Sequence, residues 1–136
     1  MRAFREVKVI GKGSFGEAIM VQRRSDKAAF VVKKVPLTGL PEKERAEAAN
    51  EVAVLDALQH PHIVRYFEAF EERGCLHIVL EFADSGDLAQ QIAAQKKRAD
   101  GAPFGEAQLL GWFAQTASAL QYVHSLSMTS ADLVFY

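Results

Sequence analysis

The sequence has few of the features that mark secreted, membrane-spanning or nucleic-acid-binding proteins. It contains one cysteine, Cys75, so no disulfide can form within the chain. No apolar run approaches the roughly 18 residues needed to cross a bilayer, and the first residues lack the apolar stretch of a secretory signal. The 16 basic and 17 acidic residues give a net charge of −1, too little to draw the chain onto nucleic acid or anionic lipid. These absences predict an intracellular, cytoplasmic protein that binds neither nucleic acid nor membrane, with nuclear or cytoskeletal association left open.

Metal-binding side chains are also scarce. His60 and His62 flank Pro61, and Cys75 and His77 lie two residues apart on an expected strand. A structural metal site normally needs four converging ligands, and neither pair supplies them. The sequence therefore predicts no metal site.

Glycine, by contrast, is concentrated near the start, in Ile10-Gly11-Lys12-Gly13-Ser14-Phe15-Gly16-Glu17-Ala18. Glycine allows a backbone to approach phosphate oxygens closely, but this spacing alone is a weak signal. A dinucleotide-binding fold would continue into a helix, whereas residues 18–21 continue an extended pattern. We therefore expect the loop to be the tip of a hairpin that lies over a ligand.

Two charged residues further along the chain fit such a ligand. In the expected strand 28–35, alternation places Lys33 and Lys34 on opposite faces, so only one of them can face the ligand. Glu51 lies on the flank of the apolar stripe of the next helix, about 41–59. Either residue alone is most simply interpreted as a solvated surface residue. Together with the glycine loop, Lys33 and Glu51 predict a clamp for nucleotide phosphates.

The remaining pattern predicts an α+β arrangement without repeats. Strands are expected at 4–10, 18–21, 28–35, 63–70 and 75–82, a capped helix after 84–87, and a long helix at 106–125. Trp112 and Phe113 are interpreted as packing residues of the long helix. The helices carry apolar stripes at three- and four-residue spacing, namely Ala48, Val52, Leu55 and Leu58 in the first and Leu109 or Leu110, Phe113, Ala117, Leu120 and Val123 in the last.

The chain resembles the N-terminal part of a eukaryotic protein kinase domain, most closely the NIMA-related serine/threonine kinases. The resemblance extends nearly continuously over 4–125, and it implies an antiparallel five-stranded small lobe with one internal helix, followed by the first helices of an incomplete large lobe. It divides residues 1–136 into a small lobe (1–80), a hinge (81–86), large-lobe helices (87–126) and a divergent or truncated tail (127–136). The matching segments are the glycine loop, Val31-Val32-Lys33, Asn50-Glu51-Val52, His60-Pro61-His62-Ile63-Val64, Leu80-Glu81-Phe82-Ala83, Asp84-Ser85-Gly86-Asp87-Leu88, Gln115, Ala119-Leu120 and Tyr122-Val123-His124-Ser125.

The resemblance also implies ATP as the cofactor and assigns site residues. Lys33 and Glu51 would be the catalytic pair, Leu80 the gatekeeper behind the adenine, and Leu55 and Tyr66 buried members of a hydrophobic stack. Kinases usually carry Val at position 18 and Ala at position 31, so this chain exchanges their volumes across the adenine slot. The residues implied to contact ATP are Ile10, Gly11, Lys12, Gly13, Ser14, Phe15, Gly16, Ala18, Val31, Lys33, Leu80, Glu81 and Ala83.

The end of the chain departs from the family. Asp132 stands in the register of the catalytic base, but Ser130 and Ala131 replace the preceding His-Arg and Val134 replaces a lysine. We interpret Asp132 as a residue of a divergent tail rather than a working base. The catalytic-loop Asn and the Asp-Phe-Gly segment that anchor Mg²⁺ are absent from these residues.

We therefore expect Mg²⁺ to arrive with ATP, and the 136-residue chain alone to be inactive, although its complete relatives phosphorylate protein Ser/Thr hydroxyls. The alternatives are an inactive kinase-like binding or regulatory module and a truncated gene product. The expected partners are protein substrates of the complete domain, and a kinase or other protein that covers the exposed stripe of the helix 106–125.

Overall fold

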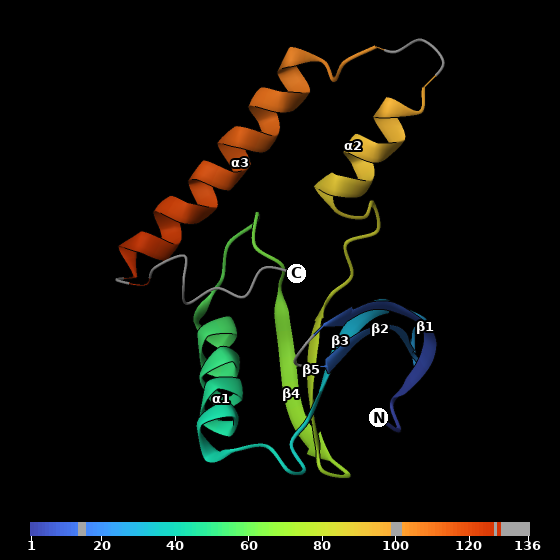
Figure 1. The fold of residues 1–136 in the computed structure, drawn as a ribbon, viewed down its shortest axis with the longest axis vertical. Helices are drawn as coiled ribbons and strands as arrows, with labels where there is room; N and C mark the ends of the chain where they lie inside the picture. Colours follow the sequence, from blue (N-terminus) through green and yellow to red (C-terminus); the bar gives the residue numbers. More distant parts are fainter. Residues whose placement is uncertain (14–15, 99–101, 127, 129–136) are drawn as a thin grey trace.

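A five-stranded antiparallel sheet and one helix form the first part of the protein, and two helices follow (Figure 1). This computed structural model describes residues 1–13, 16–98, 102–126 and 128. The strand order is β1-β2-β3-β5-β4, which confirms the α+β fold predicted from the sequence. The elements are β1 (Phe4–Gly13), β2 (Gly16–Arg23), β3 (Ala29–Pro36), α1 (Glu42–Ala57), β4 (Tyr66–Glu72), β5 (Cys75–Glu81), α2 (Leu88–Lys96) and α3 (Glu106–Ser125).

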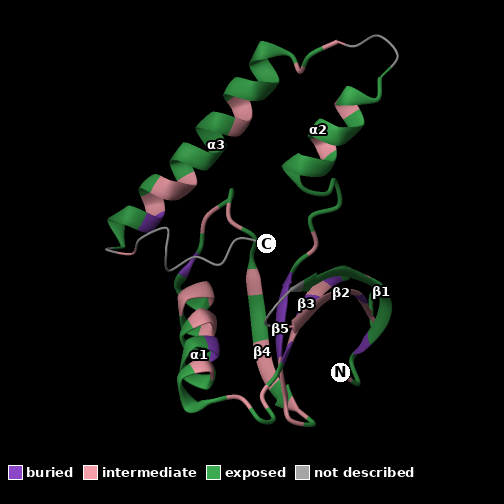
Figure 2. Cartoon of the chain, in the orientation of Figure 1, coloured by how far each residue is buried: buried purple, intermediate pink, exposed green. Residues whose placement is uncertain are grey.

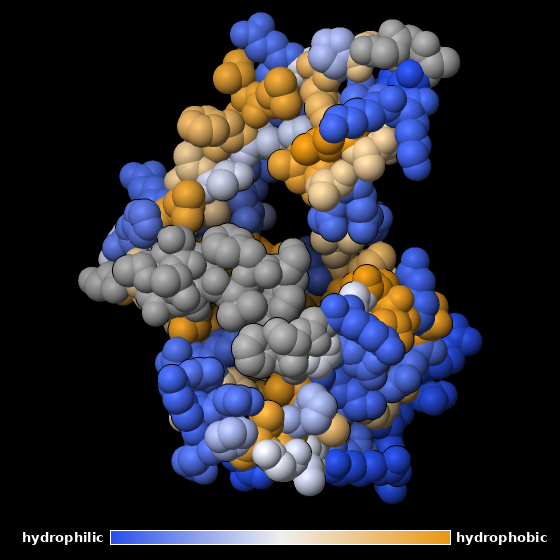
Figure 3. All heavy atoms as spheres, viewed as in Figure 1, coloured by the Kyte–Doolittle hydropathy of each residue, from blue (hydrophilic) through white to orange (hydrophobic). Residues whose placement is uncertain are grey.

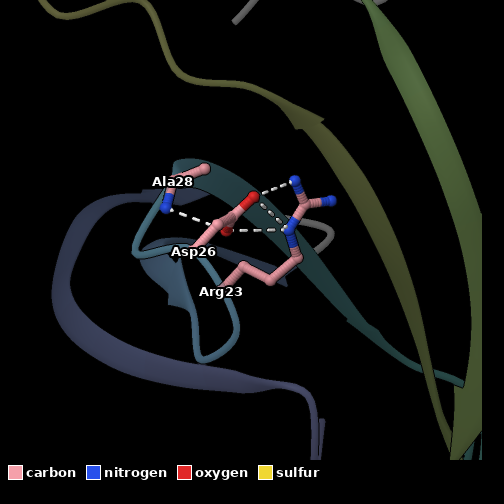
Figure 4. Close-up of polar contacts among 3 residues, drawn as sticks. All are labelled: Arg23, Asp26 and Ala28. Carbon is pink, nitrogen blue, oxygen red and sulfur yellow. Dashed lines mark hydrogen bonds and ion pairs between the residues drawn. The ribbon is translucent and has the colours of Figure 1, made fainter.

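The β2–β3 turn is closed by the carboxylate of Asp26. This carboxylate accepts hydrogen bonds from the Arg23 guanidinium, with Nη2 at 2.5 Å, and from the backbone amide of Ala28 at 3.1 Å (Figure 4). The bond from Arg23, and then the bond from Ala28, lower the pKa of Asp26 to about 2. At the β4–β5 turn, Arg73 and Gly74 have φ values of 55° and 71°, the positive values that a two-residue hairpin turn requires.

The core lies on the inner face of the curved sheet, and the first residues of the chain pack against it. It combines aromatic and β-branched side chains, as expected where strands pack across a pleated surface. Figure 2 shows buried residues running along β5, which lies between β3 and β4 in the sheet. The core cluster consists of Phe4, Ile19, Val21, Phe30, Val32 and Val79.

Helix α1 lies beside β4 (Figure 1). Its apolar stripe faces inward as predicted, with Ala48 buried and Val52 and Leu55 half-buried. The helix ends at Ala57, two residues before the predicted end, and Leu58 is extended and buried.

Helix α2 begins where the sequence predicted, with the Asp87 carboxylate accepting a hydrogen bond from the amide of Gln90 at 2.7 Å. Helix α3 has the predicted bounds. Its last turns contact the segment after α1, where the hydroxyl of Tyr122 accepts a hydrogen bond from the amide of Gln59 at 3.0 Å and its ring stacks on His60.

The upper part of α3 differs from one expectation. Trp112 packs against Phe104, with ring centroids 5.0 Å apart, but Phe113 is 74% exposed and is not a packing residue among the described residues. Leu109 and Leu110 are also exposed, and hydrophobic side chains gather over α2 and α3 in Figure 3. Within the part of the chain that the structure describes, the stripe of α3 is thus uncovered over its first half and is buried at Val123. Within the described ranges, no helix combines the length and apolarity that a membrane span requires.

Candidate nucleotide-binding site

The two charged residues that the sequence singled out meet in the structure. The ammonium of Lys33, on β3, lies 2.8 Å from Oε1 and 2.9 Å from Oε2 of Glu51, on α1. Lys33 is only 6% exposed, and the side chain of Glu51 is also largely shielded from water. A buried ammonium needs such a partner because desolvating an unpaired charge costs several kcal/mol. The pair therefore fixes the position of α1 against the sheet.

Strand register shows which residues share the face of Lys33. Cross-strand partners point to the same side of a sheet, and Lys33 stands opposite Ala18 on β2 and Ile78 on β5. One pleat further along, Val31 stands opposite Leu80. We call the face that carries these residues the nucleotide face. It presents the ammonium of Lys33 beside apolar side chains.

The exchange of volumes at positions 18 and 31 lies on this face. Val31 is two residues from Lys33 on β3, so it is the diagonal neighbour of Ala18. Both side chains are half-buried.

The glycine loop forms the hairpin tip between β1 and β2, as predicted. Gly13 stands opposite Gly16 in the register, and Ile10 and Lys12 are exposed on β1. Gly11 stands opposite Ala18, where an added Cβ would lie 3.9 Å from the Ala18 methyl, an ordinary contact. Ser14 and Phe15 lie outside the described residues.

Gly16 serves the fold itself. Its φ is 141°, which side chains rarely adopt, and an added Cβ would collide with the backbone carbonyl of Lys34. The sequence pattern did not separate this role from contact with phosphate. The third glycine is needed for the close approach of β2 to β3, whether or not a ligand is present.

The expected hinge follows β5. Leu80, which stands opposite Val31 on the nucleotide face, is only 5% exposed. The amide of Glu81 donates to the carbonyl of Arg65 at 2.8 Å, and the carboxylate of Glu81 accepts from the amide of Arg65 at 3.1 Å. Ala83 is exposed, and its backbone groups make no hydrogen bond to another described residue. Asp132 lies outside the described residues.

Two features of the site were missed by sequence reasoning. Ile78 is fully buried beside Lys33, and alternation from Leu80 along β5 would have identified it. Tyr122 connects α3 to the end of the helix that carries Glu51, and no local sequence signal predicts such a contact between distant segments. Leu55 and Tyr66, expected to be buried, are half-buried.

Comparison with known proteins identifies the class. The family model described as the protein kinase domain matches residues 4–133, and the chain belongs to this family. The small-lobe topology is the one predicted from the sequence.

The relatives are NIMA-related kinases, as the resemblance indicated. The chain is 41% identical to serine/threonine-protein kinase Nek1 of Mus musculus over 133 residues, which cover 98% of this chain and 11% of the relative. It is also 41% identical to the probable serine/threonine-protein kinase nek3 of Dictyostelium discoideum over 98% of this chain and 12% of the relative. Serine/threonine-protein kinase Nek5 of Homo sapiens is 36% identical over 93% of this chain and 17% of its own length. The chain thus spans less than a fifth of the length of these relatives, and the matches do not favour the alternative of an inactive kinase-like binding or regulatory module.

Proposed function

We propose that this chain binds ATP as the nucleotide-binding part of a serine/threonine protein kinase domain. The observation that supports the proposal most directly is the buried Lys33–Glu51 pair, at 2.8 and 2.9 Å, on the face that also carries the glycine hairpin. In the complete domain, we propose transfer of the ATP γ-phosphate to Ser or Thr hydroxyls of protein substrates, the activity named for the relatives.

The residues present fit the nucleotide. Ala18, Val31 and Leu80 supply an apolar surface suited to a purine ring, and the free backbone groups of Ala83 can hydrogen-bond its edge. The ammonium of Lys33 neutralises phosphate charge, while the carboxylate of Glu51 holds the ammonium in one position. Gly11 leaves room for phosphate oxygens because it has no side chain.

The described residues offer no evident site for Mg²⁺. Within the described residues, no group of three or more His, Cys, Asp or Glu side chains could hold a metal ion. We therefore propose that Mg²⁺ enters with the ATP phosphates, which are themselves good oxygen ligands for it. The protein contribution described here is to bind and orient the nucleotide.

Thermal denaturation of the 136-residue chain with and without ATP tests the proposal. Ligand at 100 times its Kd stabilises a protein by about 2.7 kcal/mol, so the melting temperature is expected to rise by several degrees. Lys33→Ala is expected to abolish this shift. The matched control is Lys34→Ala, because Lys34 is the next residue on the same strand but points to the opposite face.

A second variant keeps the test informative if Lys33→Ala does not fold. Glu51→Gln keeps the size of the side chain and removes the charge that orients Lys33, so we expect ATP to bind about tenfold more weakly. Titration with a fluorescent ATP analogue measures this affinity directly. Unchanged affinity in both Lys33→Ala and Glu51→Gln would refute the proposed site.

A further inference from the structure

Cys75 and His77 lie two residues apart on β5, so their side chains point to the same side of the sheet. Lys34 stands opposite His77, and it points to the other side of β3 from Lys33. Cys75, His77 and Lys34 line a cavity of about 550 Å³ on this side, away from the nucleotide face. A neighbouring cavity of about 280 Å³ shares Cys75 and Lys34. The half-buried Cys75 thus borders space that a ligand can occupy.

His77 presents a hydrogen-bond acceptor to the larger cavity. The residue is 2% exposed, and its ring stacks on that of Phe70 with centroids 5.1 Å apart. Nδ1 lies 3.1 Å from the carbonyl oxygen of Cys75, which can only accept, so Nδ1 carries the proton. Burial lowers the pKa of His77, so the ring is neutral near pH 7 and Nε2 keeps its lone pair.

Nε2 of His77 has no hydrogen-bond partner among the described residues. No side-chain nitrogen or oxygen of these residues is both buried from water and without a hydrogen bond, so Nε2 must reach accessible space. The cavity is the space that His77 lines. A ligand there meets a fixed acceptor, which selects a ligand that carries an N–H or O–H group.

The rest of the cavity lining is mostly charged and carries both signs. Arg2, Lys34 and Arg73 contribute cations, and Glu6 and Glu72 contribute carboxylates. An apolar ligand would displace water from these charges without replacing its hydrogen bonds. A polar ligand that carries both signs can pair with cations and carboxylates alike. The cavity therefore suits a zwitterion with N–H groups, whichever sign of charge is in excess.

We propose that Cys75 is a thiolation site, at which a small zwitterionic thiol peptide is attached by a disulfide bond and donates an N–H group to Nε2 of His77. Such a peptide supplies each feature that the cavity selects, namely amide N–H groups, an ammonium and carboxylates. The cavity volume lies within the usual range of small-molecule sites. The site is separate from the nucleotide face, because β3 lies between the two.

Attachment proceeds by thiol–disulfide exchange with the disulfide of the peptide, which is the oxidant. The Cys75 thiol loses its proton to water, and the thiolate attacks one sulfur of the peptide disulfide. A new S–S bond forms at Cys75, the S–S bond of the peptide breaks, and the other half leaves as a thiolate that takes up a proton. The free thiol peptide reverses the reaction, so the attachment is reversible.

Rates of thiolation of the 136-residue chain test the recognition of the peptide. Glutathione disulfide is the peptide probe, and methyl methanethiosulfonate, which transfers a thiomethyl group without charge or N–H, is the control. Mass spectrometry follows both reactions at the single cysteine, in the folded chain and in the chain unfolded by urea. We expect the ratio of the probe rate to the control rate to be at least about tenfold higher in the folded chain. Steric hindrance alone would lower this ratio, because the peptide disulfide is the larger reagent.

Nitrogen-15 NMR of the wild-type chain reads the contact at Nε2 directly. The resonance of an unprotonated ring nitrogen moves upfield when that nitrogen accepts a hydrogen bond. We expect the Nε2 resonance of His77 to move upfield after thiolation by glutathione disulfide and to stay in place after thiomethylation. His62, which is exposed in the turn after α1, provides a resonance that neither reaction should move.

Two variants assign the preference to His77. His77→Phe keeps a ring against Phe70 and removes Nε2, so we expect the rate ratio in the folded chain to fall about fivefold. His62→Phe is the matched control and should leave the ratio unchanged, because His62 does not line the cavity. If His77→Phe does not fold, the NMR comparison on the wild-type chain decides.

The proposal is overturned by a rate ratio that is no higher in the folded chain than in urea. It is also overturned by an Nε2 resonance that moves equally after both reactions or after neither, and by an unchanged rate ratio in folded His77→Phe. None of these measurements uses a nucleotide, so their outcome is independent of whether ATP binds as proposed above.

Discussion

Replacing Gly16 with alanine is expected to destabilise the fold, whereas Gly11→Ala is expected to weaken nucleotide binding alone. At Gly16, an alanine must adopt a φ of 141°, a strain on the order of 1–3 kcal/mol. Its Cβ also meets the carbonyl of Lys34, and relieving such overpacking adds about 1–3 kcal/mol. We expect a loss of about 3 kcal/mol, which lowers the melting temperature of a chain of this size by about 10 °C.

At Gly11 the same change meets only the Ala18 methyl, at 3.9 Å, and the backbone needs no positive φ. The free energy of unfolding should therefore change by less than about 0.5 kcal/mol, since no clash arises and alanine lowers the entropy of the unfolded chain. The added methyl would lie where phosphate approaches, so affinity for ATP should fall about tenfold.

Two assays on the same preparations separate these effects. Urea denaturation gives the free energy of unfolding of each variant, and titration with a fluorescent ATP analogue gives the affinity. Similar losses of stability in both variants would refute the structural distinction between the two glycines. An unchanged ATP affinity in Gly11→Ala would refute the close approach of the loop to phosphate.

Three further expectations concern other parts of the protein. Ala18→Val should crowd the adenine slot and weaken ATP binding, and Ala18→Val with Val31→Ala should restore it, so equal affinities in all three proteins would contradict the volume exchange. Burial, and then the nearby Lys34 ammonium, lower the pKa of His77 in the folded state. The unfolded chain then binds the proton more readily, and stability should fall as pH drops below about 6.5; urea denaturation at pH 7.5 and 5.5 should show a smaller fall in His77→Asn. Tyr122→Phe removes the acceptor of a backbone amide after α1 and should cost about 1 kcal/mol in the same assay, and an unchanged value would show that the bond contributes nothing.

The Lys33–Glu51 pair could be predicted from the sequence because its determinants are local. Alternation along one strand allowed only one of Lys33 and Lys34 to face the ligand, and helical spacing placed Glu51 beside an inward stripe. The order of strand and helix then brought the two residues together. Each step depends on a period of two or of 3.6 residues, which a sequence displays directly.

Features that depend on contacts between distant segments could not be predicted in this way. The pattern placed the start of β4 at Ile63, but pairing with β5 begins at Tyr66 and is irregular before Glu68. The exposure of Phe113 likewise depends on whether another segment covers α3, which a helical period does not reveal. Propensity and spacing describe one element, whereas register and coverage belong to pairs of elements.

The position of Glu51 depends both on local helical spacing and on contacts between distant segments. Glu51 lies six residues before Ala57, about 9 Å along the helix, and Tyr122 on α3 holds the segment directly after that end. At its other side Glu51 is held by Lys33, so α1 is fixed between the sheet and α3. Tyr122 thus joins α3 to the segment that follows the helix carrying Glu51, across 63 residues of the chain.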